Sequence, residues 1–216
     1  MRFDLLAFLK ELPKSYGQIG AMLPSSPCLG RAMIEPIKKA EHPLSILEVG
    51  PGTGPFTKQI FELMGPEDKF FICEINPRFM ERLKEKFASN PDYLRNKDRI
   101  VFYQGPVQEL AERYPFHKFD MIVSSLPFSN FSPEMVDELL GLYRGMLAPH
   151  GVLSFCEYWG VRKLSTFFST PSRRERLKGV DQVISDWTSR TEQEGEVITK
   201  LSVLNFPPAM AIQFCY

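Results

Sequence analysis

Short apolar runs alternate with amphipathic stretches from about residue 44 onward. The runs are rich in β-branched and aromatic residues, which is typical of buried strands. Between them, apolar residues recur at three- and four-residue steps, which is typical of helices packed on a sheet. The pattern predicts strands at 45–49, 70–75, 99–103, 120–124 and 152–159, and helices at about 55–64, 77–88, 107–113 and 133–147. This alternation predicts a mostly parallel sheet with helices on both faces.

The end of the sequence departs from this rhythm. The apolar segments 196–206 and 209–216 follow each other with only prolines between them. Two adjacent strands without a crossover helix must pair antiparallel. A mostly parallel seven-stranded sheet with an antiparallel C-terminal hairpin resembles class I S-adenosylmethionine-dependent methyltransferases. We therefore predict one Rossmann-like α/β methyltransferase domain over 1–216, with an N-terminal helical segment at 1–40 and the core at 44–216.

Composition narrows the range of partners. Of the 216 residues, 44% are hydrophobic and 24% are charged, which is ordinary for a globular protein, and 26 basic side chains balance 26 acidic ones. Zero net charge argues against a general attraction to polyanions such as nucleic acid. The four cysteines are scattered without a C-x-x-C pair, so we expect buried thiols in a reducing cytoplasm and no metal site. We expect neither a secretory signal nor a transmembrane segment.

A glycine-rich turn, "LEVGPGTGPF" at 47–56, follows the first predicted strand and opens a helix. Gly50, Gly52 and Gly54 allow the backbone to approach a ligand closely. Glycines at this spacing also occur in plain tight turns. The spacing E-x-G-x-G-x-G differs from the dinucleotide fingerprint G-x-G-x-x-G.

Two acidic residues make S-adenosylmethionine the predicted ligand of this turn. Glu48 precedes the turn, where its carboxylate can orient the ammonium of a methionine moiety. Glu74 ends the second strand, about 20 residues later, where a carboxylate can accept both ribose hydroxyls. As alternatives, Glu48 caps the turn and Glu74 is an ordinary surface carboxylate.

The predicted adenine end departs from the common pattern of the class. A Gly-Asp pair often follows the third strand, whereas this sequence has "QGPVQEL" at 104–110, with Pro106 in place of the acid. We expect the adenine to contact the backbone of Pro106 and Val107, the side chain of Gln108 and the apolar side chain of Ile75.

The segment "SSLPFSNF" at 124–131 ends the fourth predicted strand, at the edge where ligands bind in such sheets. Proline removes a donor, so the segment presents acceptors. A neutral amine that attacks a methyl group needs acceptors for its hydrogens and an aromatic face for its developing charge. Ser125, Leu126, Pro127 and Phe128 are therefore the predicted acceptor site, and Ser125 also borders the cofactor. Alternatively, the Phe128 and Phe131 rings fill the core.

This segment resembles that of amino-methyltransferases. It is similar to the rRNA adenine dimethylases and closer to the bacterial phospholipid N-methyltransferases that act on phosphatidylethanolamine. Segments 17–33, 49–60 and 204–214 resemble the second family's P-S-S block, glycine loop and N-x-P-P-A segment. The resemblance implies that Pro24, Ser25 and Ser26 form a pocket wall near the methionine end of the cofactor. The family commonly has glycine in the segment that here reads Ser124-Ser125. This difference changes the predicted acceptor pocket, so it affects the identity of the substrate more than the chemistry.

The expected function is S-adenosylmethionine-dependent N-methylation of phosphatidylethanolamine or a related phospholipid. The alternatives are an rRNA adenine N6-methyltransferase and a non-catalytic protein that binds adenosylmethionine or a membrane. Residues 2–12 form a predicted amphipathic helix, and 161–179 combine aromatic and basic side chains. We expect both segments to give a cytoplasmic protein peripheral contact with an anionic membrane.

Overall fold

The computed structural model describes residues 26–40, 43–158, 171–202 and 208–216. They form a seven-stranded sheet in the order β3-β2-β1-β4-β5-β7-β6. β1 to β5 pair parallel, whereas β7 is antiparallel to both β5 and β6, so the predicted sheet and C-terminal hairpin are confirmed. The strands are β1 Ser45–Val49, β2 Lys69–Glu74, β3 Ile100–Gln104, β4 Phe119–Ser124, β5 Leu147–Tyr158, β6 Glu196–Ser202 and β7 Ala209–Cys215.

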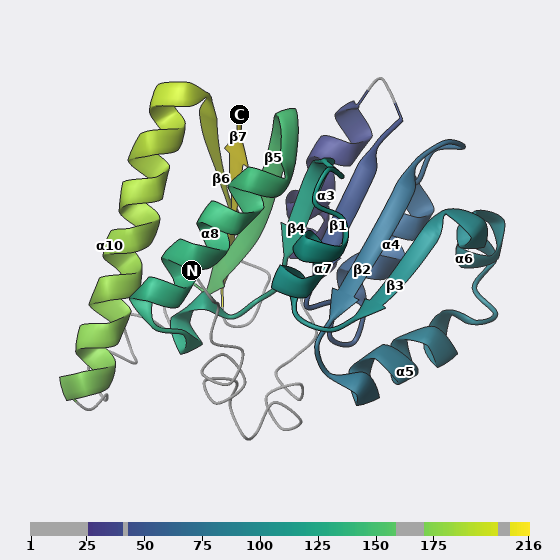
Figure 1. Ribbon diagram of the computed structural model, residues 1–216, viewed down its shortest axis with the longest axis horizontal. Coiled ribbons are helices and arrows are strands. Elements are labelled where there is room, and N and C mark those ends of the chain that lie inside the picture. Colours follow the sequence, from purple (N-terminus) through teal and green to yellow (C-terminus); the bar gives the residue numbers. More distant parts are fainter. Residues whose placement is uncertain (1–25, 41–42, 159–170, 203–207) are drawn as a thin grey trace.

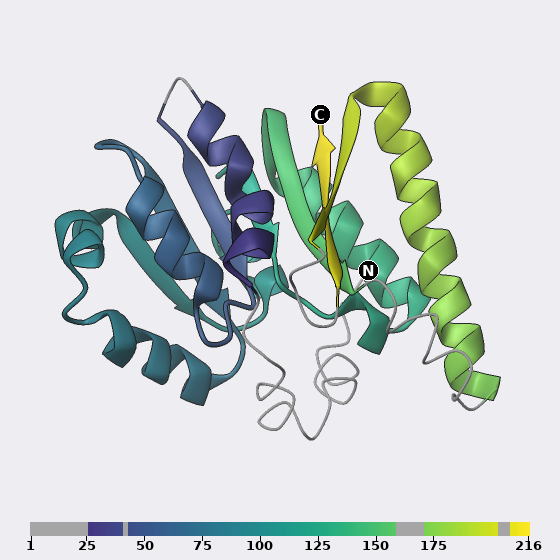
Figure 2. The same ribbon diagram turned by 180° about the vertical axis from the view of Figure 1, so that it is seen from behind.

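Helices cover both faces of the sheet (Figures 1 and 2). Buried side chains of α3, α4 and α5 pack on one face, and those of α7, α8 and α10 pack on the other. The helical elements are α3 Pro27–Lys39, α4 Pro55–Leu63, α5 Pro77–Phe87, α6 Pro91–Asn96, η1 Lys97–Arg99, α7 Val107–Arg113, η2 Phe128–Asn130, α8 Pro133–Met146 and α10 Pro171–Glu194.

The central strands are buried on both sides. In β1, Ile46 packs into the cluster under α3 and α4, whereas Leu47 and Val49 pack into the cluster under α7 and α8. Because side chains alternate along a strand, apolar residues at successive positions supply both layers. This explains why the parallel strands appear in the sequence as unbroken apolar runs.

Several helices start at a recognisable cap. The side chains of Ser26, Asn76, Asn90 and Ser132 accept hydrogen bonds from backbone N–H groups in the first turn, and proline follows each of them. Proline is favoured there because the first helical N–H has no partner within the helix. These caps fix where α3, α5 and α8 begin, and each of these helices starts at the carboxyl edge of the parallel strands.

Three features were not anticipated from the sequence. α6 and the 24-residue helix α10 were missed, and residues 171–179, which were assigned to a membrane-contacting segment, form the first turns of α10. β5 begins at Leu147 instead of residue 152, because Leu147 already pairs with Phe119 of β4. An irregularity that includes His150, with a φ of 61°, separates this pair from the regular pairing that starts at Val152. Across the described ranges, no helix is long and apolar enough to cross a membrane. The amphipathic segment 2–12 lies outside the described residues.

Candidate functional site

The predicted site residues follow three neighbouring strands. Val49 of β1 pairs with Cys73 of β2 on one side and with Ser124 of β4 on the other. The glycine turn, Glu74 and Ser125 therefore come together at the carboxyl ends of adjacent parallel strands. Ligands of open α/β sheets bind at this edge, next to the point where the strand order reverses. Here the order reverses between β1 and β4.

The glycine turn depends on left-handed backbone conformations. Gly50, Gly52 and Gly54 have φ values of 71°, 57° and 76°, which other residues adopt only with strain. A Cβ at Gly50 would lie 2.8 Å from the Leu126 side chain, so the turn and the β4 segment pack directly together. Among the residues that the structure describes, none has an atom within 4 Å of a Cβ placed at Gly52. The turn thus leaves open space above Gly52, which a ligand can fill.

Glu48 is fully buried beneath this turn. One carboxylate oxygen, Oε2, accepts a 2.6 Å hydrogen bond from the hydroxyl of Thr57 in α4, while Oε1 is buried without a partner. Burial raises the pKa of Glu48 to about 8, against the lowering effect of the Thr57 hydrogen bond. A buried, half-satisfied carboxyl group is costly, and a cationic ligand group would supply both the missing partner and the compensating charge.

Glu74 is also buried, with 2% of its surface exposed, so it is not an ordinary surface carboxylate. Its Oε1 accepts from the backbone N–H of Asn76 at 2.8 Å, and its Oε2 accepts from that of Gly52 at 3.3 Å. Burial raises the pKa of Glu74, and the backbone hydrogen bonds oppose that rise. Each oxygen keeps a lone pair, so the carboxylate can still accept two ligand hydroxyls.

The predicted adenine contacts lie around the end of β3 and the start of α7. Pro106 and Val107 are buried, whereas Ile75 and Gln108 are partly exposed. Gly105, whose amide donates to the Glu74 carbonyl at 3.1 Å, ties this segment to β2. The Gln108 Oε1 atom is buried without a hydrogen-bond partner. Gln108, two residues after the proline that replaces the acid common in the class, therefore offers an amide acceptor in this segment.

The β4 segment is held rigidly. The Ser125 amide donates to the Val49 carbonyl at 2.9 Å, and the Leu126 carbonyl accepts from the Phe128 amide at 3.0 Å. The Ser125 hydroxyl is buried without a partner. Phe128 is 3% exposed and its ring lies 5.3 Å from that of Phe155, so in this structure it packs in the core, as Phe131 does. A role of the Phe128 ring towards an acceptor stays a prediction.

Buried polar atoms without partners concentrate at this edge. Within the described ranges, four buried side-chain atoms make no hydrogen bond, and three of them belong to Glu48, Gln108 and Ser125. Buried polar groups are almost always hydrogen-bonded in native proteins. These residues lie at or just beyond the carboxyl ends of β1, β3 and β4, and unmet acceptors there fit a polar ligand that brings an ammonium, an amino group and hydroxyls. The residues present therefore fit S-adenosylmethionine.

Ser26 is the described member of the predicted P-S-S wall, and Pro24 and Ser25 lie outside the described residues. Its hydroxyl caps α3 by accepting from the Leu29 amide at 3.2 Å, and it lies 3.4 Å from the Ser202 hydroxyl at the end of β6. Thr57 and Asn76 were missed by the sequence analysis, although they support the two glutamates. Their roles depend on hydrogen bonds to the two carboxylates, from the Thr57 hydroxyl and the Asn76 backbone amide, that no spacing pattern records.

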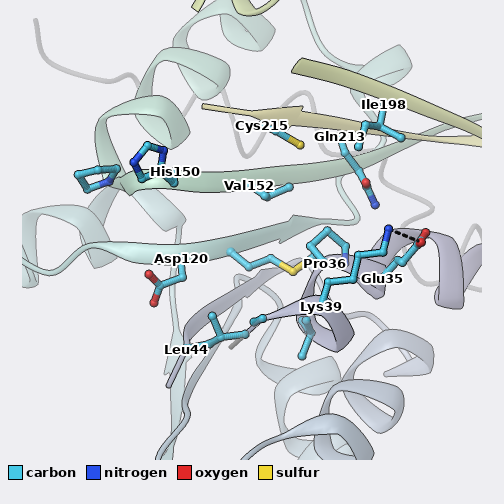
Figure 3. Close-up of a pocket in the computed structure, with 14 residues that line it drawn as sticks. Glu35, Pro36, Lys39, Leu44, Asp120, His150, Val152, Ile198, Gln213 and Cys215 are labelled. Atoms are coloured by element: carbon cyan, nitrogen blue, oxygen red, sulfur yellow. Dashed lines mark ion pairs between the residues drawn. The ribbon is translucent and has the colours of Figure 1, made fainter. Parts of the chain in front are cut away.

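A separate pocket of about 340 Å³ lies at the opposite edge of the sheet (Figure 3). It is formed by the end of α3, the starts of β4 and β5, and the C-terminal hairpin. Glu35 at its rim forms ion pairs with Lys39, at 2.9 Å, and with Lys200. None of the predicted site residues lines this pocket. It therefore takes no part in the arrangement at the carboxyl edge.

Comparison with known proteins places this arrangement in a family. A family model described as "Methyltransferase domain" matches residues 47–153. An ornithine lipid N-methyltransferase from Singulisphaera acidiphila is 30% identical over 154 residues, which cover 70% of this chain and 76% of that protein. A probable dimethyladenosine transferase from Caenorhabditis elegans is 36% identical over 111 residues, which cover 51% of this chain and 32% of that protein.

Solved structures share the fold. An O-methyltransferase from Bacillus cereus in complex with SAH superposes with a TM-score of 0.65 at 11% identity, and the match covers 100% of this chain and 93% of that chain. The mixed seven-stranded sheet and the cradle at its carboxyl edge agree with these likenesses. The chain belongs to the S-adenosylmethionine-dependent methyltransferases.

Proposed function

We propose that this enzyme transfers a methyl group from S-adenosylmethionine to the amino group of phosphatidylethanolamine or a related amino lipid. The observation that carries the proposal is the β4 segment 124–131, which contains no titratable side chain but offers a buried, unpartnered hydroxyl at Ser125. Such a segment suits an amine, which needs acceptors for its hydrogens, better than a hydroxyl acceptor, which needs a general base. The similarity to an ornithine lipid N-methyltransferase supports a lipid acceptor.

The cofactor would be held by the cradle described above. We assign the methionine ammonium to Glu48, the ribose hydroxyls to Glu74 and the adenine to Gln108, Ile75 and the backbone at Pro106 and Val107. Ser26, with Pro24 and Ser25, would border the methionine end. When bound, the cofactor supplies a methyl group on a positively charged sulfur. The rigid backbone of the glycine turn and of Ser125 contributes by positioning, which is the main source of rate in such displacements.

The acceptor amine would lie against Ser125, Leu126, Pro127 and Phe128. The Ser125 hydroxyl is free to accept a hydrogen bond from the amine, and the Leu126 carbonyl keeps one lone pair beyond its bond to the Phe128 amide. The amine must arrive uncharged, because only then does its nitrogen carry a lone pair. Since the segment offers no base, the proton leaves to solvent before the amine binds and after each transfer.

Peripheral membrane contact would bring this site to its substrate. We propose that residues 2–12 and 161–179 lie on an anionic membrane, as their sequences predict. The first turns of α10 carry Arg173, Arg174, Arg176 and Lys178 and lie at the same edge of the sheet as the β4 segment. Each basic side chain near an anionic leaflet contributes about 1 kcal/mol of attraction.

Replacing Gly52 by alanine tests the cradle. We expect a melting temperature that falls by only a few degrees, because the added methyl meets open space and the strain of a positive φ costs about 1–2 kcal/mol. S-adenosylmethionine affinity should fall about tenfold or more, because the methyl occupies the ligand's space. Gly145→Ala is the matched control, since Gly145 also has nothing within 4 Å but lies in α8. Calorimetric titration that shows equal affinity in both variants would contradict the assignment.

Defined vesicles test the acceptor. The enzyme should methylate phosphatidylethanolamine or an ornithine lipid presented in phosphatidylcholine vesicles, and co-sedimentation should increase when anionic lipid is added. Methylation that is absent from every amino lipid but present on adenine-containing RNA would favour the alternative of an rRNA adenine methyltransferase. The similarity to a dimethyladenosine transferase is the observation that supports this alternative.

A further inference from the structure

Arg176 is the fourth residue with a buried, unpartnered polar atom. It lies in the second turn of α10, and its Nε atom is buried without a hydrogen-bond partner. Neighbouring Leu177 and Val180 are buried, so this turn packs against the body of the protein. A guanidinium group carries five N–H donors and a fixed charge, and burying part of it without a partner costs free energy.

The packing of α10 brings this helix into contact with η2, which belongs to the proposed acceptor segment. Gly179 lies directly against Pro133, the first residue of α8, because a Cβ on Gly179 would come within 2.5 Å of the Pro133 ring. The first turns of α10 extend past the start of α8, as Figures 1 and 2 show, and α10 also contacts η2. Arg176 precedes Gly179 by three residues and Val180 by four, which puts it on the same face of the helix.

The β4 segment and Arg176 offer opposite kinds of polar group to a ligand. The β4 segment and η2 offer neutral acceptors for an amine and no cation for an anion. Arg176 offers donors and positive charge and no acceptor. An amino lipid headgroup is zwitterionic: phosphatidylethanolamine joins its amine to a phosphate by two carbons, and an ornithine lipid carries an amine and a carboxylate on one amino acid. Arginine suits either anion, because its planar fork binds both phosphate and carboxylate.

We propose that Arg176 binds the anionic group of a zwitterionic lipid headgroup while Ser125 and its neighbours hold the amine. Arg176 is then a specificity-determining residue that selects zwitterionic amino lipids over simple amines. The inference rests on the proposed function and adds to it the chemical group, phosphate or carboxylate, that the site requires beside the amine.

Short-chain acceptors separate this role from membrane attraction. Phosphatidylethanolamine and ornithine lipid with short acyl chains, kept below their micelle-forming concentrations, serve as phosphate and carboxylate substrates, and hexylamine serves as an amine without an anion. The full chain and its Arg176→Met variant are compared by kcat/KM on all three. Methionine keeps most of the aliphatic stem, Arg176→Lys keeps the charge without the fork, and Arg190→Met changes an exposed arginine farther along the same helix.

We expect Arg176→Met to lower kcat/KM on the preferred zwitterionic acceptor about 10- to 100-fold, mainly through KM, and to leave hexylamine unchanged. The kcat/KM of Arg176→Lys should lie between those of Arg176→Met and the wild type, and the kcat/KM of Arg190→Met should equal that of the wild type. The phosphate and carboxylate arms identify which anion Arg176 binds. Equal losses on zwitterion and amine, or no loss on either, would overturn the inference and leave the proposed function standing. A wild-type enzyme that methylates neither lipid would overturn both.

Discussion

Replacing Glu48 by glutamine is expected to stabilise the ligand-free protein at alkaline pH and to weaken S-adenosylmethionine binding about 10- to 100-fold. Glutamine keeps the shape of the side chain and can still accept the hydrogen bond from Thr57. It removes only the charge that the ligand's ammonium would meet. The two effects have opposite signs because burying the carboxylate is costly until a cation pairs with it.

The pH dependence follows from the direction of the shift. Burial raises the pKa of Glu48 to about 8, well above its value in an unfolded chain, near 4.5. The folded protein therefore holds an extra proton between these pH values, and its stability falls as pH rises through that window. The wild type and the glutamine variant should melt alike near pH 5. At pH 8.5 the variant should be more stable by about 2–4 kcal/mol, which is several degrees.

The affinity for the cofactor should change with pH in the opposite direction to the stability: it should rise as the pH rises towards about 8. A cation pairs with the ionised carboxylate, so binding must release the proton below about pH 8, and wild-type affinity should fall about tenfold for each pH unit below that. The variant's affinity should lack this tenfold fall per pH unit, because glutamine has no proton to release. Scanning and titration calorimetry between pH 5 and 9 measure both quantities. Glu62→Gln, on the exposed side of α4, is the control. A variant with wild-type affinity across the range would remove Glu48 from the ammonium site.

The second large effect is expected from Glu74→Ala, which should weaken S-adenosylmethionine binding by about 1.5–3 kcal/mol. The carboxylate would lose its contacts with the ribose hydroxyls, and the amides of Gly52 and Asn76 would lose their acceptor. The glycine turn would then be less well fixed, so a modest fall in melting temperature is expected as well. Affinity is measured by titration calorimetry with S-adenosylmethionine and with S-adenosylhomocysteine.

A control variant distinguishes the loss of the Glu74 contacts from a general effect of the protein's net charge. Glu85→Ala removes an exposed carboxylate from α5 and should leave both ligands bound as in the wild type. Unchanged affinity in Glu74→Ala would exclude the ribose role. A loss that Glu85→Ala shares would instead reflect the net charge of the protein.

The strands and the glycine turn could be predicted from the sequence because their signals are local. Apolar runs at 45–49 and 120–124 identify buried strands, and three alternating glycines identify a turn with left-handed conformations. Whether Glu48 and Glu74 were exposed could not be predicted. Their burial depends on how α4 and the turn pack over the strand ends, and that is a property of the assembled sheet.

The features that were missed depend on tertiary contacts. α10 has few apolar residues for its length, and only Leu177, Val180, Ile184 and Thr191 are buried, so its sequence resembles a polar linker with basic residues. Its helical form follows from packing against α8, where the Trp187 indole donates to Asp137 at 2.7 Å. Phe128 illustrates the same limit. Its place beside proline left open both a ring that faces an acceptor and a ring that fills the core; the structure packs it against Phe155, and the acceptor role stays a prediction.

We propose that this S-adenosylmethionine-dependent enzyme methylates the amine of a lipid. The most direct measurement incubates the full chain with methyl-labelled S-adenosylmethionine and either total lipid or total RNA, then follows the label in each fraction. Label should enter the lipid fraction, move with a methylated amino lipid on chromatography, and fall sharply in the Glu48→Gln variant at pH 8.5. Label that entered RNA and left lipid unmarked would contradict the claim.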